Sequence, residues 1–309
     1  MTGSASSPGR GWPRAAALLG VVLATSIVNA GVLIAVPLLA LLMARGLRGL
    51  GVALAALVAT LVVASGTHDG IWYAERAWSV LLAGSFVALT MVVPAWRLSS
   101  RALAAVGGAA FVATGLLAVR SDAWGALDAA ISGEVRASSD QALSTLSTLG
   151  RGEPPSDAVV GAMQQLAETQ ASVFPAMIAL ASMAALGVAW WIRTRLVGEG
   201  DQGLGPLRDF RFNDHLVWLF IGGLLLLFAQ WGDALVRLGS NAIVFMAALY
   251  MLRGAAVFVF LSGGMSLFGY VTVLVGLVVA APVLMGMAVL IGVGDTWLDL
   301  RSRVRERTA

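Results

Sequence analysis

Charged side chains inside the apolar runs are the residues of this sequence that could perform chemistry or bind a polar ligand. Arg253 is the clearest case, because it is the one charged residue in the apolar run 239–263. A charge in the middle of a membrane span costs about 3 kcal/mol or more, so it normally pairs with a polar group or meets a ligand. Glu75, Gln230 and Asp233 are the candidate partners, and nothing in the sequence selects among them. Alternatively, Arg253 lies near an interface and extends its guanidinium group toward water.

A second group of polar residues lies near the end of the chain. Asp295 and Asp299 are four residues apart, and Asp299 is four residues before Arg303, so a continuing helix would place them on one face. Two carboxylates could bind a cation or take part in proton coupling, although no third ligand is visible. We favour ion pairing of Asp299 with Arg303 and its basic neighbours at the membrane boundary. Trp297 and Arg301 complete this tail motif.

The sequence contains little that matches the catalytic motifs of known enzymes. The chain has no Cys, so it cannot form a disulfide, a thiolate nucleophile or a cysteine metal site. Its two histidines, His68 and His215, are expected on opposite sides of the membrane and cannot share a metal ion or a catalytic dyad. Residues 198–203 match GxGxxG letter for letter, but no strand precedes them and no soluble core could surround them. We therefore expect no enzyme activity, no metal and no cofactor.

The composition indicates an integral membrane protein. Of 309 residues, 59% are hydrophobic and only 12% are charged, whereas a soluble domain carries about 25% charged residues. The run 267–294 contains no charged residue, and about 18 apolar residues suffice to cross a bilayer as a helix. Lipid offers the backbone no hydrogen-bond partners, so such runs must be helical. We predict an all-α, polytopic transmembrane helix bundle with eight or nine membrane segments.

The arginine residues predict how the chain is oriented. They flank the apolar runs and do not form one basic face, so we expect the lipid bilayer, and no nucleic acid, as a partner. Cytoplasmic loops are rich in arginine, which places the pairs 10/14, 45/48 and 97/101 inside. The predicted regions are a cytoplasmic tail (1–14), a transmembrane bundle (15–119), an external amphipathic helical segment (120–172), a second bundle (173–294) and a basic cytoplasmic tail (295–309).

Within the first bundle we expect spans at 15–28, 31–44, 49–65, 80–96 and 102–119, and within the second at 173–192, 215–231, 239–261 and 267–294. Three spans after Arg211 would leave the tail outside, whereas its four arginines favour the inside. Either the last run, which contains Pro282, folds back as two short segments, or one upstream segment does not cross. We expect the C-terminus in the cytoplasm.

The external segment predicts a helical hairpin. Apolar residues recur at near-helical spacing from Trp124 to Leu149, which indicates an amphipathic helix. The run 150–155 ends that helix, and Ser156 is a suitable N-cap for a second one. The hairpin either fills space between two spans or forms a lid over an external cavity, and both interpretations stay open.

Small residues recur on the first helix. Ala16, Gly20 and Ala24 fall at i, i+4 and i+8, which gives this helix a face on which another helix could lie closely. The alternative is that Ala is abundant in this chain and the spacing has no meaning.

Two stretches of the second half resemble a known family. The run 292–301 (GVGDTWLDLR) and the run 206–212 (PLRDFRF), which opens a span, resemble the YybS-like family of predicted bacterial membrane proteins. That family is loosely similar to the substrate-binding S components of energy-coupling-factor vitamin transporters. There a small-residue face on the first helix docks on a transmembrane coupling subunit, and the resemblance implies this role for Ala16, Gly20 and Ala24. It also implies a partner ATPase that supplies the ATP chemistry.

The leading hypothesis is a non-enzymatic multi-pass protein of the bacterial cytoplasmic (inner) membrane that binds a small molecule between its helices and supports its uptake. A hydrophilic cavity that contains Arg253 and opens to the outside would favour it. The rival hypothesis is a structural or assembly protein that holds other membrane or envelope factors in place. A solidly packed bundle with its charged or apolar features turned outward would favour the rival.

Overall fold

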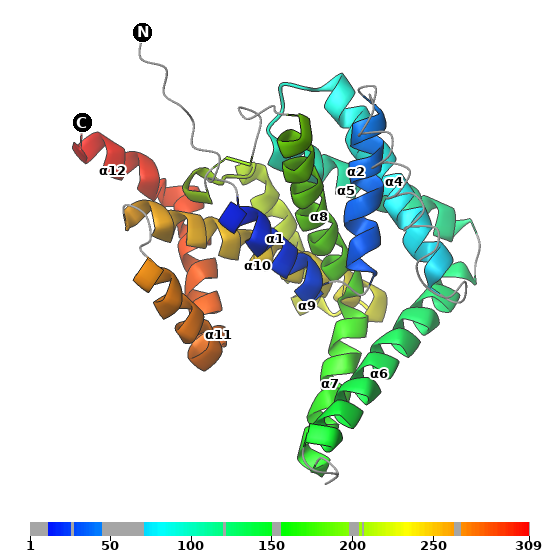
Figure 1. Ribbon diagram of the computed structural model, residues 1–309. Helices are drawn as coiled ribbons and strands as arrows, with labels where there is room; N and C mark the ends of the chain where they lie inside the picture. Colours follow the sequence, from blue (N-terminus) through cyan, green and yellow to red (C-terminus); the bar gives the residue numbers. More distant parts are fainter. Residues whose placement is uncertain are drawn as a thin grey trace. The chain divides into compact units, whose positions relative to one another are not determined.

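The computed structural model describes residues 12–25, 28–44, 71–119, 122–149, 156–197, 204–205, 207–262 and 267–308. The predicted span 49–65 and the external residue His68 lie outside this part of the chain. The described residues are helical and contain no strand (Figure 1). The chain divides into two compact units, an N-terminal unit (Ala15–Glu199) and a C-terminal unit that comprises Gly200–Ala309 with Met1–Arg14. The all-helical prediction is confirmed for the described residues.

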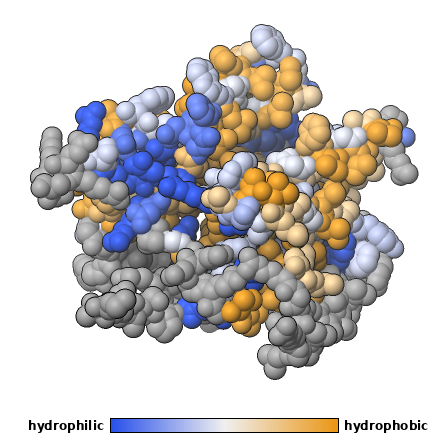
Figure 2. Space-filling model, turned by 90° about the horizontal axis from the view of Figure 1, so that it is seen from above, coloured by the Kyte–Doolittle hydropathy of each residue, from blue (hydrophilic) through white to orange (hydrophobic). Residues whose placement is uncertain are grey.

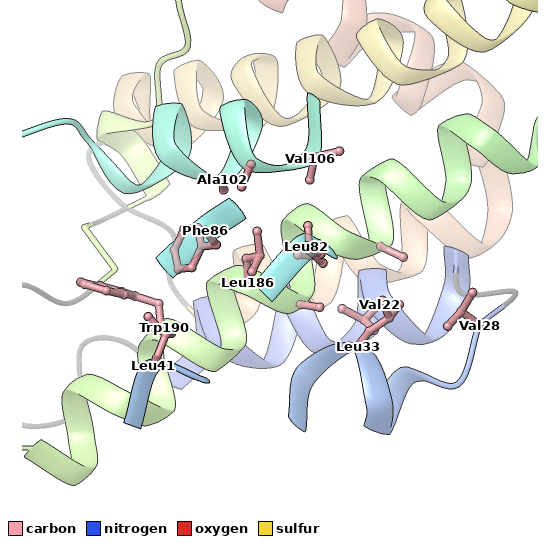
Figure 3. Close-up of a cluster of buried hydrophobic side chains, with 14 residues drawn as sticks. Val22, Val28, Leu33, Leu41, Leu82, Phe86, Ala102, Val106, Leu186 and Trp190 are labelled. Carbon is pink, nitrogen blue, oxygen red and sulfur yellow. The ribbon is translucent and has the colours of Figure 1, made fainter. Parts of the chain in front are cut away.

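Five helices surround the core of the N-terminal unit, namely α1 (Trp12–Thr25), α2 (Ala30–Met43), α4 (Trp72–Val92), α5 (Leu98–Ala118) and α8 (Phe174–Val197). Their buried side chains include Leu33, Leu82, Phe86, Leu186 and Trp190, which converge from α2, α4 and α8 (Figure 3). The Phe86 and Trp190 rings meet edge to face with their centroids 6.2 Å apart. Close packing of these side chains fixes which faces of the helices point inward.

Side-chain hydrogen bonds stabilise this unit at two places. Asn29 begins α2 as its N-cap, and its side chain accepts a hydrogen bond from the Gly31 amide at 2.9 Å. The Trp78 indole Nε1 donates to the Ser182 Oγ at 2.9 Å, which joins α4 to α8. A hydrogen bond between spans stabilises their packing, because neither group could find water in lipid.

The segment between the spans forms the two helices that the sequence predicts. They are α6 (Ala123–Leu149) and α7 (Asp157–Ser172), which lie beside each other and extend away from the other helices of their unit (Figure 1). Only part of the predicted amphipathic face is buried, where Ile131 and Val135 pack against Ala167 and Phe174. Farther along α6, Leu146 is 47% exposed. The far end of this hairpin therefore presents surface that no described residue covers.

The C-terminal unit begins with two short 3-10 helices, η2 (Leu207–Asp209) and η3 (Asp214–Leu216), followed by α9 (Val217–Ala229), α10 (Asp233–Leu261), α11 (Leu267–Leu298) and α12 (Leu300–Thr308). Helix α10 begins at Asp233, six residues before the predicted start of this span at residue 239. The reversal needs only three residues, because Gln230 adopts the left-handed conformation and Gly232 has a φ of 117°, which favours glycine.

The long last run does not form one straight helix. Ala280 has non-helical angles (φ −139°, ψ 39°), two residues before Pro282, and α11 bends sharply (Figure 1). Proline lacks an N–H and clashes with the preceding turn, which explains a kink at this place. A methyl group on Gly276 would lie 2.9 Å from Leu284 Cδ1, whereas residues eight apart are separated by about 12 Å along a straight helix. The chain therefore turns back inside this run, but its second part, Val279–Leu298, is long enough to cross a membrane and is not the short segment that the sequence analysis offered.

Helices long and apolar enough to cross a membrane confirm a multi-pass protein. In the described part of the chain five qualify, namely α4, α5, α8, α10 and the second part of α11 (Val279–Leu298). Shorter apolar helices cover Arg14–Thr25, Ala30–Met43 and Asp214–Ala229. Many large apolar side chains are exposed, and Figure 2 shows wide hydrophobic areas beside a hydrophilic one. Lipid tails would cover such areas. The structure thus supports five full-length spans among the described residues and leaves the predicted eight or nine unconfirmed.

Candidate functional site

Arg253 lies at the centre of a buried charge network in the C-terminal unit. Its side chain is 2% exposed, and it pairs with two carboxylates. Arg253 Nε donates to Asp295 Oδ2 at 2.9 Å, Nη1 donates to Asp214 Oδ1 at 2.5 Å, and Nη2 donates to the Asp295 main-chain oxygen at 3.2 Å. Every nitrogen of the guanidinium group therefore has an acceptor, and the charge is neutralised inside the protein.

Asp295 links Arg253 to the C-terminal helix. The Asp295 side chain is fully buried, and its Oδ2 also accepts a hydrogen bond from Arg301 Nη2 at 2.8 Å. Arg301 is 2% exposed, and its Nη1 donates to the main-chain oxygens of Arg208 and Phe210 at 3.1 and 3.0 Å. Arg253, Asp295, Arg301 and Asp214 form what we call the charge network. It ties the segment around η2 and η3 to α10, α11 and α12.

Aromatic side chains cover the network on one side. The Arg253 guanidinium carbon lies 5.4 Å from the centroid of the Phe212 ring, which is a cation–π contact. Phe212 meets Tyr250 edge to face at 5.3 Å, and Tyr250 meets Phe220 at 5.7 Å. Burial beside these rings strengthens the Arg253–Asp295 pair, whose two side chains are 2% and 0% exposed.

Small residues allow α10 and α11 to approach closely enough for the pairing. A methyl group added to Gly254 would overlap the main-chain oxygen of Ala288, and one added to Gly292 would overlap that of Tyr250. Ala288 and Gly292 are four residues apart, so they form one small-residue face of α11. The backbones are therefore in contact beside Arg253, and the Asp295 carboxylate reaches it from the next turn.

An interruption of the helix between α11 and α12 places Arg301 close to Asp295. Helix α11 ends at Leu298, Asp299 has a φ of 41°, and α12 begins at Leu300. On a continuous helix, a residue six positions later lies about 9 Å farther along and on a different face. Aspartate tolerates the left-handed conformation better than most residues. The change of direction at Asp299 thus lets Arg301 bind the same oxygen as Arg253 (Figure 1).

The partners that the sequence offered for Arg253 are not those in the structure. Asp233 begins α10 twenty residues earlier, which is about 30 Å away at 1.5 Å per residue. Gln230 ends α9 just before it. Glu75 belongs to the N-terminal unit, where it accepts the Asn29 amide at 3.0 Å and pairs with Arg76 at 2.6 Å. The alternative that Arg253 reaches toward water is also wrong, because the side chain is buried.

The residues of the tail motif also have partners that differ from the predicted ones. Asp299 pairs with Arg211 at 2.5 Å and not with Arg303, because the helix does not continue through Asp299. Both partners are partly exposed, so this pair contributes little stability. Trp297 is 68% exposed. Asp295 and Arg301 are the members of the motif that join Arg253, a connection that the sequence did not reveal.

Asp214 is the network residue that sequence reasoning missed. Its side chain is 63% exposed although it binds the buried Arg253. It follows Asn213, whose side chain accepts the His215 amide at 3.1 Å and so begins the helical path into α9. An acidic residue directly before an apolar run was the available signal, but such residues are common at span ends.

The arrangement is suited to holding helices together. Arg253 donates from every guanidinium nitrogen and Arg301 from its two terminal nitrogens to protein acceptors, whereas Arg301 Nε and Asp295 Oδ1 are buried without a hydrogen-bond partner among the described residues. Two carboxylates balance the two arginines. Among the residues that the structure describes, no group of three His, Asp or Glu side chains could hold a metal ion. We therefore interpret the charge network as a lock between helices.

The predicted helix-docking face lies on α1, in the N-terminal unit. Ala16, Gly20 and Ala24 are exposed on α1, and a methyl group on Gly20 would touch nothing within 4 Å. Val22 on the opposite side of α1 is fully buried in the core. The small-residue face is thus open to the surroundings.

Comparison with protein families gives one match. The model of a family described as predicted membrane protein (DUF2232) matches residues 15–296. This range covers most of the chain, including nearly all of the charge network, so the chain belongs to that family. No curated protein and no solved structure matches it.

Proposed function

We propose that this member of the DUF2232 family is a non-enzymatic subunit of a larger membrane assembly, and that it docks through α1. One observation carries the proposal, namely that α1 buries Val22 in its own unit while its small-residue face stays open. Small residues let helix backbones approach closely, which is how helices associate in lipid. The partner element that would pack against such a face is a transmembrane helix.

The first version of this proposal is a subunit for small-molecule uptake. The partner would be a transmembrane coupling subunit with an ATPase, as in the vitamin transporters to whose S components the YybS-like family is loosely similar. Arg253 does not serve as the ligand-binding residue in this version, because its nitrogens are already bound to Asp214 and Asp295. The ligand would bind among the helices of the N-terminal unit.

The second version is a scaffold that holds other membrane or envelope factors. The α6–α7 hairpin favours it, since the hairpin extends from its unit and exposes apolar side chains such as Leu146 and Leu166 (Figure 1). Its described residues carry five acidic side chains, Asp128, Glu134, Asp140, Asp157 and Glu168, against one arginine, Arg136. A basic partner surface would complement this charge.

Replacing Gly20 with leucine tests the docking face. We expect the tagged Gly20→Leu variant, gently solubilised from its native membrane, to lose the proteins that accompany the wild type, because the larger side chain keeps a partner helix at a distance. Mass spectrometry would identify co-purifying proteins and retained small molecules. An ATPase with a coupling subunit, or one stoichiometric metabolite, would support uptake, whereas envelope factors without a ligand would support the scaffold.

Gly115→Leu is the matched control. Gly115 lies on α5, is exposed and has nothing within 4 Å of an added methyl group. The control makes the same chemical change on a different open helix face, so it should keep the partners. Equal recovery of partners with both variants and the wild type would contradict docking through α1.

The proposed orientation places the N- and C-termini in the cytoplasm and the hairpin outside the bacterial inner membrane. The chain lacks cysteine, so single-cysteine variants report one position each. We expect Ser138→Cys, on exposed α6, to react with a membrane-impermeant maleimide in intact cells. Ser302→Cys, on α12, should react only after permeabilisation. Labelling of Ser302→Cys in intact cells would show that the tail lies outside.

A further inference from the structure

Helix α7 presents a row of apolar side chains on one side. Val159, Ala162, Met163 and Leu166 fall at i, i+3, i+4 and i+7, which places them along the same side of a helix. Val159 is 39% exposed and Leu166 is 51% exposed, while Ala162 is exposed and Met163 is half-buried. We call these four residues the α7 stripe. An apolar stripe of this kind normally packs against another element.

The contact of α7 with α6 uses a different side of the helix. Ala167 is 5% exposed and packs against Ile131 and Val135 of α6. It follows Leu166 directly, so the two side chains point about 100° apart around the helix axis. The pairing of α6 with α7 therefore leaves the α7 stripe beside the seam, where a third helix could lie.

Lipid tails do not account for the exposure of the α7 stripe. Neither α6 nor α7 is among the described helices that are apolar enough to cross a membrane. Helix α6 has 27 residues, so its composition and not its length sets it apart from the spans. Apolar side chains outside the hydrocarbon region face water unless a partner covers them.

The hairpin that carries the α7 stripe is acidic. Segment 120–172 contains seven Asp and Glu residues and three Arg residues, which gives a net charge of −4 (three minus seven). Glu134, Asp140, Asp157 and Glu168 are exposed on its two helices. The surface around the α7 stripe is therefore negatively charged, and it attracts positively charged groups.

This charge distinguishes between the possible occupants of the α7 stripe. A second copy of the chain would bring a second segment of net charge −4, and like charges oppose association. A membrane surface with anionic lipids would repel the hairpin in the same way. A helix that carries basic side chains beside an apolar stripe of its own would complement both the charge and the apolar surface.

We propose that the α7 stripe docks a basic amphipathic helix of a partner protein. The partner helix lies along α7, covers Val159 and Leu166, and directs its basic side chains toward the carboxylates of the hairpin. The proposal rests on the scaffold version of the proposed function, for which it names the chemistry of the partner. It does not require the docking face on α1.

Photo-crosslinking in living cells tests the proposal on the full-length chain. p-Benzoylphenylalanine at position 162 places a crosslinker within the α7 stripe, and mass spectrometry identifies the segment to which it attaches. We expect a segment of another protein with net positive charge and apolar residues at helical spacing. Leu166→Arg should lower the yield of this product at least about tenfold, because it removes an apolar contact and repels a basic helix.

Gln164→Arg is the matched control. Gln164 is exposed on α7, two residues before Leu166 and so about 200° around the helix. This variant adds the same charge away from the α7 stripe and should keep the product. Glu134→Gln/Glu168→Gln should lower the yield, since two attracting charges are lost. Crosslinking to a second copy, to lipid, to the same chain or to an acidic segment, or no product at all, would overturn the proposal.

Gly20→Leu separates this proposal from docking through α1. Gly20 lies on α1 and not on the hairpin, so the crosslink at position 162 should be as strong in this variant as in the wild type. Loss of the crosslink in Gly20→Leu would show that the α7 stripe has no partner of its own. Absence of the crosslink in the wild type would contradict the basic partner and leave the test of the α1 face unchanged.

Discussion

Replacing Arg253 with leucine should lower the stability of the C-terminal unit by about 3 kcal/mol or more, because removing one partner from a buried pair leaves the other charge uncompensated. Asp295 is fully buried, and it would keep only Arg301 as a charged partner. Membrane insertion should not suffer, since leucine favours insertion more than arginine does. We therefore expect normal amounts of inserted protein with a lower melting temperature in detergent, followed by tryptophan fluorescence.

Asp214→Asn is the matched control for this prediction. Asp214 also binds Arg253, but its side chain is 63% exposed, so losing its charge should cost about 1 kcal/mol or less. The double variant Arg253→Leu/Asp295→Leu should recover part of the loss, because replacing a whole buried ion pair with apolar residues is often neutral. If Arg253→Leu melted like the wild type, the charge network would not lock the helices.

Replacing Gly292 with alanine should separate α10 from α11. The added methyl group would overlap the main-chain oxygen of Tyr250, and Gly254→Ala would overlap that of Ala288. Main-chain atoms cannot rotate away, so the helices must move apart, at a cost of about 1–3 kcal/mol or more for overpacking. The movement would also stretch the Arg253–Asp295 pair. We expect both variants to melt at lower temperature and to lose solubility in mild detergent.

Gly286→Ala shows whether the position or the glycine itself matters. Gly286 lies on the same helix, is exposed and has nothing within 4 Å of an added methyl group. Alanine is favoured over glycine in a helix by about 0.5–1 kcal/mol, so this variant should be as stable as the wild type or slightly more. A similar loss for Gly286→Ala and Gly292→Ala would show that the contact between α10 and α11 is not the cause.

The charge network also bears on the family of predicted membrane proteins to which the chain belongs. Its two arginines are expensive in lipid, yet Asp214 of η3, Asp295 of α11 and main-chain oxygens at η2 bind them inside one unit. We therefore interpret the charge network as a structural feature of this unit. The small-residue face of α1 is a place where the described structure leaves a helix surface open.

Local sequence determined the class of this protein and many of its elements. Apolar runs of spanning length predicted the positions of α8 and α10, because lipid forces such runs to be helical whatever surrounds them. Gly150–Pro155 and Ser156 located the boundary between α6 and α7, since turns and caps depend on neighbouring residues. The start of α10 was misplaced because the polar residues after Gly232 suit both a turn and the first turns of a helix.

Tertiary structure alone decided the partners of Arg253. They lie 39 and 42 residues away in the sequence, and residues so distant in sequence meet only when helices pack, a step that local periodicity does not encode. The bend at Ala280 and the left-handed Asp299 determine where Asp295 and Arg301 lie. The sequence by itself therefore determined that a charge lies within an apolar run, and the packing of α10 against α11 decided that it is buried and that protein carboxylates neutralise it.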